Sequence, residues 1–223
     1  MTFVLPDAGG DLPQGYAFDC YVDDGVSRSE PAPVSLEVNP QVSRTAQLEL
    51  EPGPNLLAFP VRPSDLAEPN LADVLRLTGA QFAVSMPGAA VAGGGRFRFF
   101  SRGAGGPDAV LGNEGFLVVH CGLPVSVPVR GPAWSAARQS RTLPKGLNLI
   151  SYPRPCPGGE TAEQLLQRTG AGFVVSTEAG SGGRSRFRVH LTGMTQPFPI
   201  RADRSYLLSM PASRVVSLPS CGP

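Results

Sequence analysis

Few residues in this sequence are of the types that carry out catalysis, and their spacing matches none of the common catalytic motifs. The chain has two histidines, His120 and His190, and Cys121 directly follows the first of them. Cys121 and His190 are the residue types of a nucleophile and its base, but a strand-end histidine beside a structural cysteine explains them better. No Gly-x-Ser-x-Gly, His-Glu-x-x-His or phosphate-binding loop is present. We therefore expect a protein that is not an enzyme and has no metal site and no cofactor.

One polar pattern occurs twice, as Arg96-Phe97-Arg98 and as Arg186-Phe187-Arg188. Alternate side chains of a β-strand point to the same face, so the two arginines of each copy share one face and the phenylalanine takes the other. Two interpretations are open. The strand is amphipathic and buries its phenylalanine in the core, or the arginine pairs bind carboxylates, sulfates or acidic glycans through their guanidinium groups.

The composition excludes several classes of protein. The 223 residues include 27 glycines and 24 prolines, which favour short strands joined by turns over long helices. A hydrophobic fraction of 41% is enough for a packed core, which argues against disorder. The net charge of +1 lacks the basic excess of a general nucleic-acid binder, and no apolar stretch has the length of a membrane span.

The most informative feature is an internal repeat. Four blocks recur in the same order, and the offset between the copies drifts by only about three residues. The histidines are not part of it, because His120 aligns with Met210; a duplicated metal or catalytic site would show duplicated ligands. The matching blocks are 55–60 with 148–153, 70–82 with 161–173, 96–98 with 186–188, and 115–118 with 205–208.

Each copy has the pattern of a small antiparallel sheet with one short helix. Asn70 and Thr161 are good N-cap residues, and the polar residue three positions later completes a capping box in each copy. Gly79 and Gly170 stand where a left-handed C-terminal cap is expected. Two turns of helix are not stable alone, so each helix must pack on its sheet. The expected strands are those that begin near residues 55, 82, 96 and 115 in the first copy and near 148, 173, 186 and 205 in the second.

The opening strand of the second copy carries a family resemblance. Residues 146–153, Gly-Leu-Asn-Leu-Ile-Ser-Tyr-Pro, resemble the Gly-x-Asn-Leu-Ile-Ser-x-Pro strand of β-rich repeat modules near the C-termini of secreted bacterial multidomain proteins. Tyr206 matches their later aromatic strand, whereas Pro54, directly before Asn55, is a departure in the first copy. The resemblance covers roughly residues 46–219 and implies no single activity.

The first forty residues contain three alternating segments, 2–5, 16–22 and 33–38. Residues 23–25, Asp-Asp-Gly, read as a hairpin turn rather than as a calcium site. The pattern resembles the last three strands of polycystic-kidney-disease-type and fibronectin-III-like immunoglobulin sandwiches, which need about seven strands and about 100 residues. Two explanations are open: the chain starts inside a domain, or another chain supplies the missing strands.

The four cysteines are widely separated, and both disulfides and buried thiols fit them. Cys156 and Cys221 flank the first and last strands of the second copy, so a bridge between them would close that module and contribute about 4 kcal/mol. Cys20 and Cys121 would then pair. The N-terminus has no signal-peptide pattern, so oxidised pairs imply a piece of a longer secreted protein.

The sequence thus predicts a mainly β chain in three parts: a partial immunoglobulin-like domain (1–40) and two repeat modules (45–130 and 141–223), with the module boundary near 130–142. The expected function is a non-catalytic, extracellular structural, adhesion or cell-surface assembly module. Its partners would be further copies of itself or neighbouring domains, not nucleic acid or a membrane. The alternative is a module that binds glycans or anions through the arginines of the repeated strands and through aromatic residues, with Trp134 as the chief candidate and Tyr152 and Tyr206 beside it.

Overall fold

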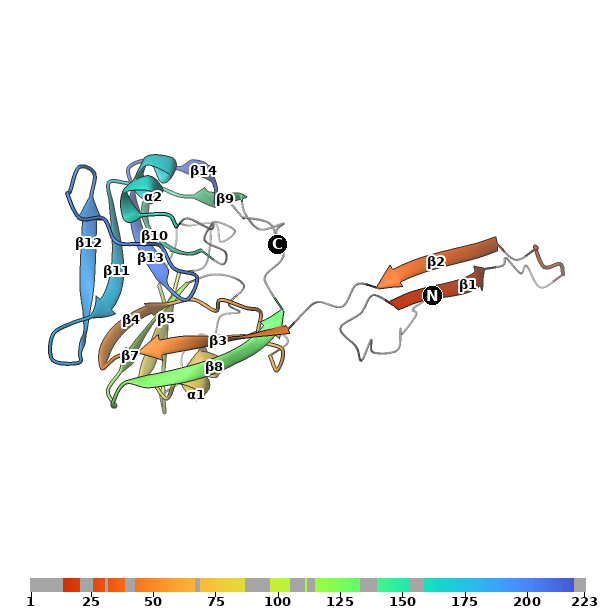
Figure 1. Cartoon of the computed structure of the whole chain (residues 1–223), viewed down its shortest axis with the longest axis horizontal. Helices are drawn as coiled ribbons and strands as arrows, with labels where there is room; N and C mark the ends of the chain where they lie inside the picture. Colours follow the sequence, from red (N-terminus) through yellow and green to blue (C-terminus); the bar gives the residue numbers. More distant parts are fainter. Residues whose placement is uncertain are drawn as a thin grey trace. The chain divides into compact units, whose positions relative to one another are not determined.

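The structure, a computed structural model, divides the chain into two compact units, residues 1–43 and 44–223 (Figure 1). The protein is mainly β, as predicted, with two helices of eight residues each in its described part. Among the described residues, no helix is long and apolar enough to cross a membrane. The residues described are 14–20, 26–30, 32–38, 43–66, 69–86, 97–104, 111, 115–132, 140–152 and 159–218.

The first unit contains an antiparallel pair of strands, β1 (Gln14–Cys20) and β2 (Ala32–Val38). Gln14 lies opposite Val38, and Cys20 lies opposite Ala32. These strands correspond to two of the three predicted segments. The third segment, 2–5, and the predicted turn at 23–25 lie outside the described residues. The assignment to an immunoglobulin-like sandwich stays a prediction.

The second unit contains two modules with the same order of elements. Module 1 consists of β3 (Ser43–Leu50), β4 (Gly53–Leu57), α1 (Leu71–Thr78), β5 (Phe82–Ser85), β6 (Arg98–Ser101), β7 (Phe116–His120) and β8 (Val125–Pro132). Module 2 consists of β9 (Ser140–Leu143), β10 (Gly146–Ser151), α2 (Ala162–Thr169), β11 (Phe173–Ala179), β12 (Ser185–Leu191), β13 (Ser205–Met210) and β14 (Arg214–Ser217).

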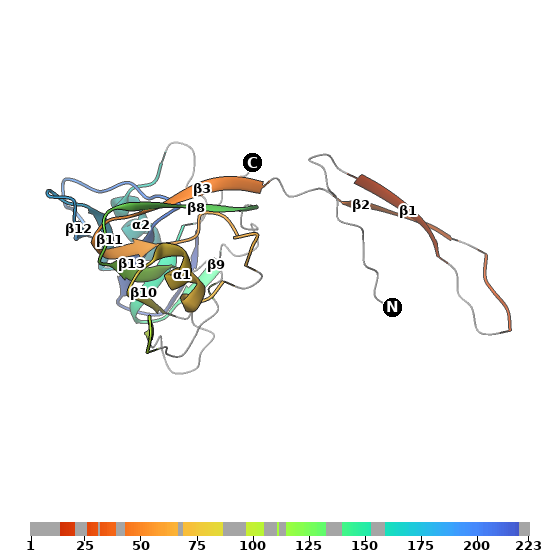
Figure 2. The same cartoon turned by 90° about the horizontal axis from the view of Figure 1, so that it is seen from below.

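The two modules also have the same sheet topology. The four-stranded sheets have the orders β4-β7-β5-β6 and β10-β13-β11-β12, which place equivalent strands side by side. A second, two-stranded sheet pairs the first strand of each module with its last, β3 with β8 and β9 with β14; β3 and β8 run beside each other in both views (Figures 1 and 2). The repeat in the sequence is thus a repeat in the fold. These outer pairs were not predicted.

Both helices begin and end as predicted. Asn70 and Asp73 form a reciprocal capping box at α1, and Thr161 and Gln164 form one at α2. Each helix ends at a left-handed glycine, Gly79 or Gly170, whose N–H bonds to a carbonyl of the last turn. In each last turn a buried threonine hydroxyl donates 2.7 Å to the carbonyl four residues earlier: Thr78 to Val74, and Thr169 to Leu165.

The repeated asparagine that opens each module locks a turn. The side-chain amide of Asn55 donates to the carbonyl oxygens of Glu51 (2.7 Å) and Gly53 (2.9 Å). The amide of Asn148 makes the same pair of bonds, and it reaches the carbonyl of Gly146 at 3.0 Å. Gly53 and Gly146 have φ of 106° and 102°, which glycine adopts without strain. The role that the two asparagines share is therefore to hold the backbone of this turn.

Each module has its own hydrophobic core between its helix and its sheets. In module 1 the helix residues Leu71, Val74 and Leu75 pack with strand residues such as Phe116 and Val118. The core of module 2 is built from the equivalent elements and contains Leu165, Leu166, Val174, Tyr206 and Leu208. Burial of this apolar surface is what makes two-turn helices stable.

The opposite faces of the two four-stranded sheets pack against each other. Along β11, Val174 belongs to the core of module 2, whereas Val175, on the other face, packs against the cluster between the modules. Hydrogen bonds join β4 and the residues beside it to module 2. Ser185 donates through its N–H to the carbonyl oxygen of Pro52 and through its hydroxyl to that of Pro54. The N–H of Leu56 donates to the hydroxyl of Thr177, and the N–H of Ala58 donates to the carbonyl oxygen of Asp203. The shared cluster contains Leu56, Met86 and Leu149, with Leu117, Val175 and Leu207 packed against it.

Candidate functional site

The predicted arginine pair of module 2 is already occupied by a carboxylate of the same module. Arg186 donates to one oxygen of Glu178 through Nε (3.1 Å) and Nη2 (2.9 Å), and Arg188 donates to the other oxygen at 2.8 Å. Burial acts to raise the pKa of Glu178, but the hydrogen bonds from Arg188 and Arg186 outweigh it and lower the pKa below its usual value. Arg186 and Arg188 therefore form ion pairs with Glu178 of the same module, and their role in binding an external ligand stays a prediction.

Module 1 does not show the same arrangement in its described part. Arg98 is the first residue of β6 and is half-buried. Arg96, the other predicted member of the pair, lies outside the described residues, and so does Trp134. The structure thus brings Arg186 and Arg188 together; for Arg96, Arg98 and Trp134 the ligand-binding role stays a prediction.

The prediction that the phenylalanines of the Arg-Phe-Arg strands are buried in the core is wrong. Phe97 is 55% exposed and Phe187 is 53% exposed. The reason lies in the register, which pairs Val174 with His190 and Ser176 with Arg188. The arginines and His190 consequently lie on the face of the sheet that the helix covers. Phe187 lies on the opposite face, which module 1 covers at β11 but not at Phe187.

His190 belongs to a polar contact that occurs only in module 2. Its ring is fully buried, and Nε2 lies 2.9 Å from the carboxylate of Glu163 on α2. Glu163 also accepts from the amide of Gln167 (3.0 Å) and from the backbone N–H of Gly193 (3.3 Å). The hydrogen bond with His190 is the main cause that lowers the pKa of Glu163. The contact ties the helix to the turn after β12, and sequence reasoning missed it.

The second histidine, His120, binds a backbone carbonyl next to the exposed Cys121. The Nε2 atom of His120 lies 2.7 Å from the carbonyl oxygen of Leu123, and the ring is buried. Cys121 is an exposed free thiol, and His190 is engaged with Glu163. The predicted bridge between Cys20 and Cys121 would join the two units and stays a prediction.

The other cysteine predictions are not addressed by the described residues. Cys156 and Cys221 lie outside them, and of Cys20 only the backbone is described. Their pairing therefore stays a prediction, which peptide mapping under non-reducing conditions tests.

Tyr152 and Tyr206, the other aromatic candidates for sugar binding, are buried. Burial and the nearby Glu160 carboxylate raise the pKa of Tyr152. Glu160 is itself buried and lies 3.0 Å from Arg168. The hydroxyl of Tyr206 accepts from the backbone N–H of Arg201 at 2.6 Å. Both hydroxyls therefore face the interior, and neither ring is available for stacking on a ligand.

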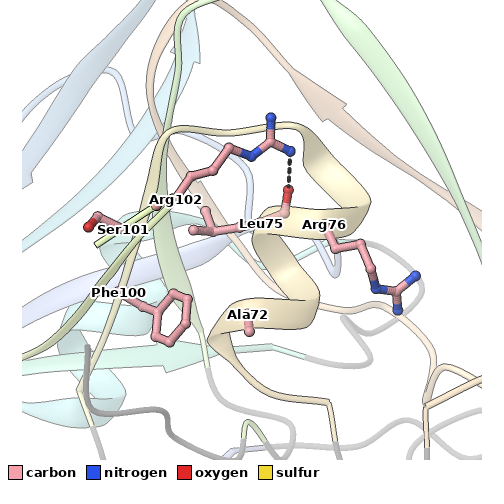
Figure 3. Close-up of a pocket in the computed structure, with 7 residues that line it drawn as sticks. Ala72, Leu75, Arg76, Phe100, Ser101 and Arg102 are labelled. Atoms are coloured by element: carbon pink, nitrogen blue, oxygen red, sulfur yellow. Dashed lines mark hydrogen bonds between the residues drawn. The ribbon is translucent and has the colours of Figure 1, made fainter. Parts of the chain in front are cut away.

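A pocket of about 380 Å³ lies between α1 and β6 in module 1 (Figure 3). The guanidinium of Arg102 lies over it and donates to the carbonyl oxygen of Leu75 at 3.4 Å, while Arg76 points away and pairs with Asp73 at 3.2 Å. Module 2 has Glu163 and His190 at the positions of Ala72 and Phe100. The residues that line the pocket are Ala72, Leu75, Arg76, Phe100, Ser101, Arg102 and Gly103.

Comparison with known proteins gives no assignment: no family model, curated protein or solved structure matches the chain. Within the described ranges, no three His, Cys, Asp or Glu residues come together as a metal site would require. Among the described residues, Arg186 and Arg188 bind Glu178, and His190 binds Glu163.

Replacement of Glu163 by glutamine is expected to weaken the pH dependence of stability. A carboxyl whose pKa is lower in the folded than in the unfolded chain stabilises the fold above its unfolded pKa of about 4.3. That contribution is lost as the pH falls through the lower folded value. Glu163→Gln keeps an acceptor for His190 but does not titrate, so urea unfolding should show a shallower loss of stability below pH 4 than in the wild type. An equal loss of stability below pH 4 in the variant and the wild type would contradict the role of Glu163 and His190.

Proposed function

We propose that this chain is a non-catalytic structural module of an extracellular or cell-surface protein, which acts in adhesion or assembly by contacts with further copies of itself or with neighbouring domains. One observation carries the proposal: the polar residues that recur in both copies hold the backbone. Asn55 and Asn148 lock turns, and Thr78 and Thr169 cap helices. Among the described residues, the polar pair of Glu163 and His190, whose residue types also occur in catalytic sites, is found in a single copy.

The strand arrangement supports the same function. Each module pairs its first strand with its last, and the two copies are joined through apolar faces. The hairpin of the first unit has no third strand among its described residues. A two-stranded sheet is marginally stable in water, and an open sheet edge is a template for another strand. This favours assembly with another domain or chain.

Sedimentation velocity of the purified chain tests the proposal. We expect reversible self-association that increases with protein concentration up to about 1 mM, a range in which contacts of about 4 kcal/mol are populated. A chain that stays monomeric throughout this range, and that also fails to bind the domains next to it in its parent protein, would contradict an assembly function.

The extracellular location rests on the cysteines, which oxidising compartments pair. Intact mass before and after reduction and alkylation tests it. A mass that rises only after reduction supports oxidised pairs. Four thiols that are alkylated without reductant would contradict the extracellular location.

Binding of an anionic glycan is the second candidate function, and the pocket of module 1 is the observation that favours it. Phe100 supplies an aromatic face and Arg102 a guanidinium, which together suit a sugar that carries a carboxylate or sulfate. A glycan array should then show acidic ligands whose binding is lost in Arg102→Gln and kept in Arg184→Gln. An array without any binding would exclude this function.

A further inference from the structure

The outer edge of β12 is an apolar surface. Strand β12 is the last strand of its sheet, and within the described part of the chain no strand pairs with its outer side. Phe187, Val189 and Leu191 alternate along it and are 53%, 46% and 48% exposed. An edge strand with alternating apolar side chains is a template for pairing unless charges or a covering segment protect it. Here the charged side chains lie on the opposite face.

The backbone groups of these same three residues point outward. The N–H of Ser185 bonds to the carbonyl of Pro52 in module 1, on the side away from β11. Since N–H groups alternate sides along a strand, Phe187, Val189 and Leu191 also present their N–H and C=O groups to the outer side. Leu191 uses its groups in a local contact with Met194. Phe187 and Val189 are thus the residues best placed to accept a further strand.

The apolar edge continues an interface that the molecule already uses. Val189 lies opposite Val175, and Phe187 lies opposite Thr177. Val175 packs against the cluster between the modules, and the hydroxyl of Thr177 accepts the N–H of Leu56 in module 1. The same sheet face is therefore covered by module 1 at β11 and left uncovered at β12, which makes the exposed side chains an extension of a buried apolar contact.

We propose that this edge binds the same edge of a second copy, as an antiparallel β12–β12 pair centred on Val189. The argument is the self-complementarity of the strand. In this register Val189 lies opposite Val189 of the second copy, and Phe187 lies opposite Leu191, so each apolar residue meets an apolar residue. A contact of this kind is isologous and closes as a dimer. The inference rests on the proposed assembly function and names its surface.

The register centred on Arg188 is disfavoured by charge. It would place the Arg188 side chains of the two copies opposite each other, and like charges directly opposite destabilise a strand pair. In the register centred on Val189, Arg188 lies opposite His190 of the second copy. The charges of that face are held by carboxylates of the same chain: Glu178 binds Arg188, and Glu163 binds His190.

The first test is a charge at the centre of the pair. Val189→Lys places two lysines on the axis, and we expect it to raise the dissociation constant of the dimer about tenfold or more. Val215→Lys is the matched control, since Val215 is an exposed valine of β14 (66%) whose substitution should leave association unchanged. Circular dichroism of both variants should remain that of the wild type, because both positions are exposed.

The second test reads the register directly, in a Cys121→Ser background that removes the exposed thiol. Hydrogen-bonded antiparallel partners have Cα atoms about 5.5 Å apart, within the range of a disulfide. Val189→Cys should therefore give a covalent dimer on mild oxidation, with the link between the two introduced thiols. In Leu191→Cys the two introduced thiols lie about 13 Å apart, four residues of strand, and should not link.

The outcomes separate this inference from the proposed function. Loss of association in Val189→Lys alone, with cross-linking of Val189→Cys alone, supports the β12 pair. Association that persists in Val189→Lys but disappears when residues 1–43 are removed would overturn the β12 pair and leave an assembly function through the first unit. A wild-type chain that is monomeric at about 1 mM overturns the β12 pair as well, and the binding of neighbouring domains then decides the proposed function.

Discussion

Gly131→Ala is expected to lower the free energy of unfolding by about 3 kcal/mol or more. A Cβ atom at this position of β8 would overlap the backbone carbonyl of Arg62. The backbone cannot move aside, because Arg62 donates to Pro132 (2.8 Å) and Ser64 donates to Arg130 (2.9 Å) on either side of the contact. Opening this contact breaks both hydrogen bonds. Urea unfolding followed by circular dichroism measures the difference.

Gly172→Ala is the control for this prediction. Its added Cβ would have the carbonyl of Ser209 as its nearest neighbour, at 3.8 Å, an ordinary contact distance. Neither Gly131 nor Gly172 has a positive φ, so the comparison reports the close approach and not backbone strain. We expect a change within about 0.5 kcal/mol at Gly172. Equal effects at the two positions would show that β8 does not lie against residues 62–64 as described.

Gly115→Ser is expected to destabilise the contact between the modules, by about 2–4 kcal/mol. Gly115 and Ser205 are equivalent positions of the two copies, and they meet in the interface. A Cβ on Gly115 would overlap that of Ser205 and lie 3.0 Å from the carbonyl of Ile150. Because the two module cores do not include this contact, the variant should lose the packing between modules before either core.

The exchange of the two residues is the decisive control. Gly115→Ser combined with Ser205→Gly moves the side chain from one copy to the other and leaves one Cβ at the contact. The double variant should recover more than half of the stability lost in Gly115→Ser, as expected for two positions in direct contact. Additive losses in the double variant would mean that the two positions do not meet.

Features that depend on local chemistry were predictable from the sequence. The helix ends follow from Asn70 and Thr161 as N-caps and from Gly79 and Gly170 as C-caps, and all four are observed. The repeat itself was enough to predict that both copies share one topology, because equivalent residues in the same order form the same elements and pack in the same way.

Features that depend on contacts between distant residues were not predictable. The pairing of β3 with β8 joins residues about eighty positions apart. The residue pattern of neither strand indicates which strand it pairs with. Alternation placed the arginines and Phe187 on opposite faces correctly, but it does not say which face the helix covers. That choice follows from the register with β11, and it is why the burial of Phe187 was predicted wrongly.

The candidate site shows the same limit. Glu163 and His190 are separated by 27 residues and have no duplicated counterpart, so the repeat carried no signal for their contact. The contact of Arg186 and Arg188 with Glu178 depends on pairing between neighbouring strands, so it can be recognised only when the hairpin register is known. A comparison of the two copies at positions 72 and 163 would have pointed to a difference between the modules, though not to its geometry.

The two copies form one structural unit, held together by their facing sheets. Native-state hydrogen exchange of the full chain, read by mass spectrometry for the peptides that contain α1 and α2, tests this most directly. Both helices are expected to exchange through the same global opening, with equal free energies that fall together in urea. Free energies that differ by more than about 2 kcal/mol, with separate urea dependences, would contradict a single unit and show two independent modules.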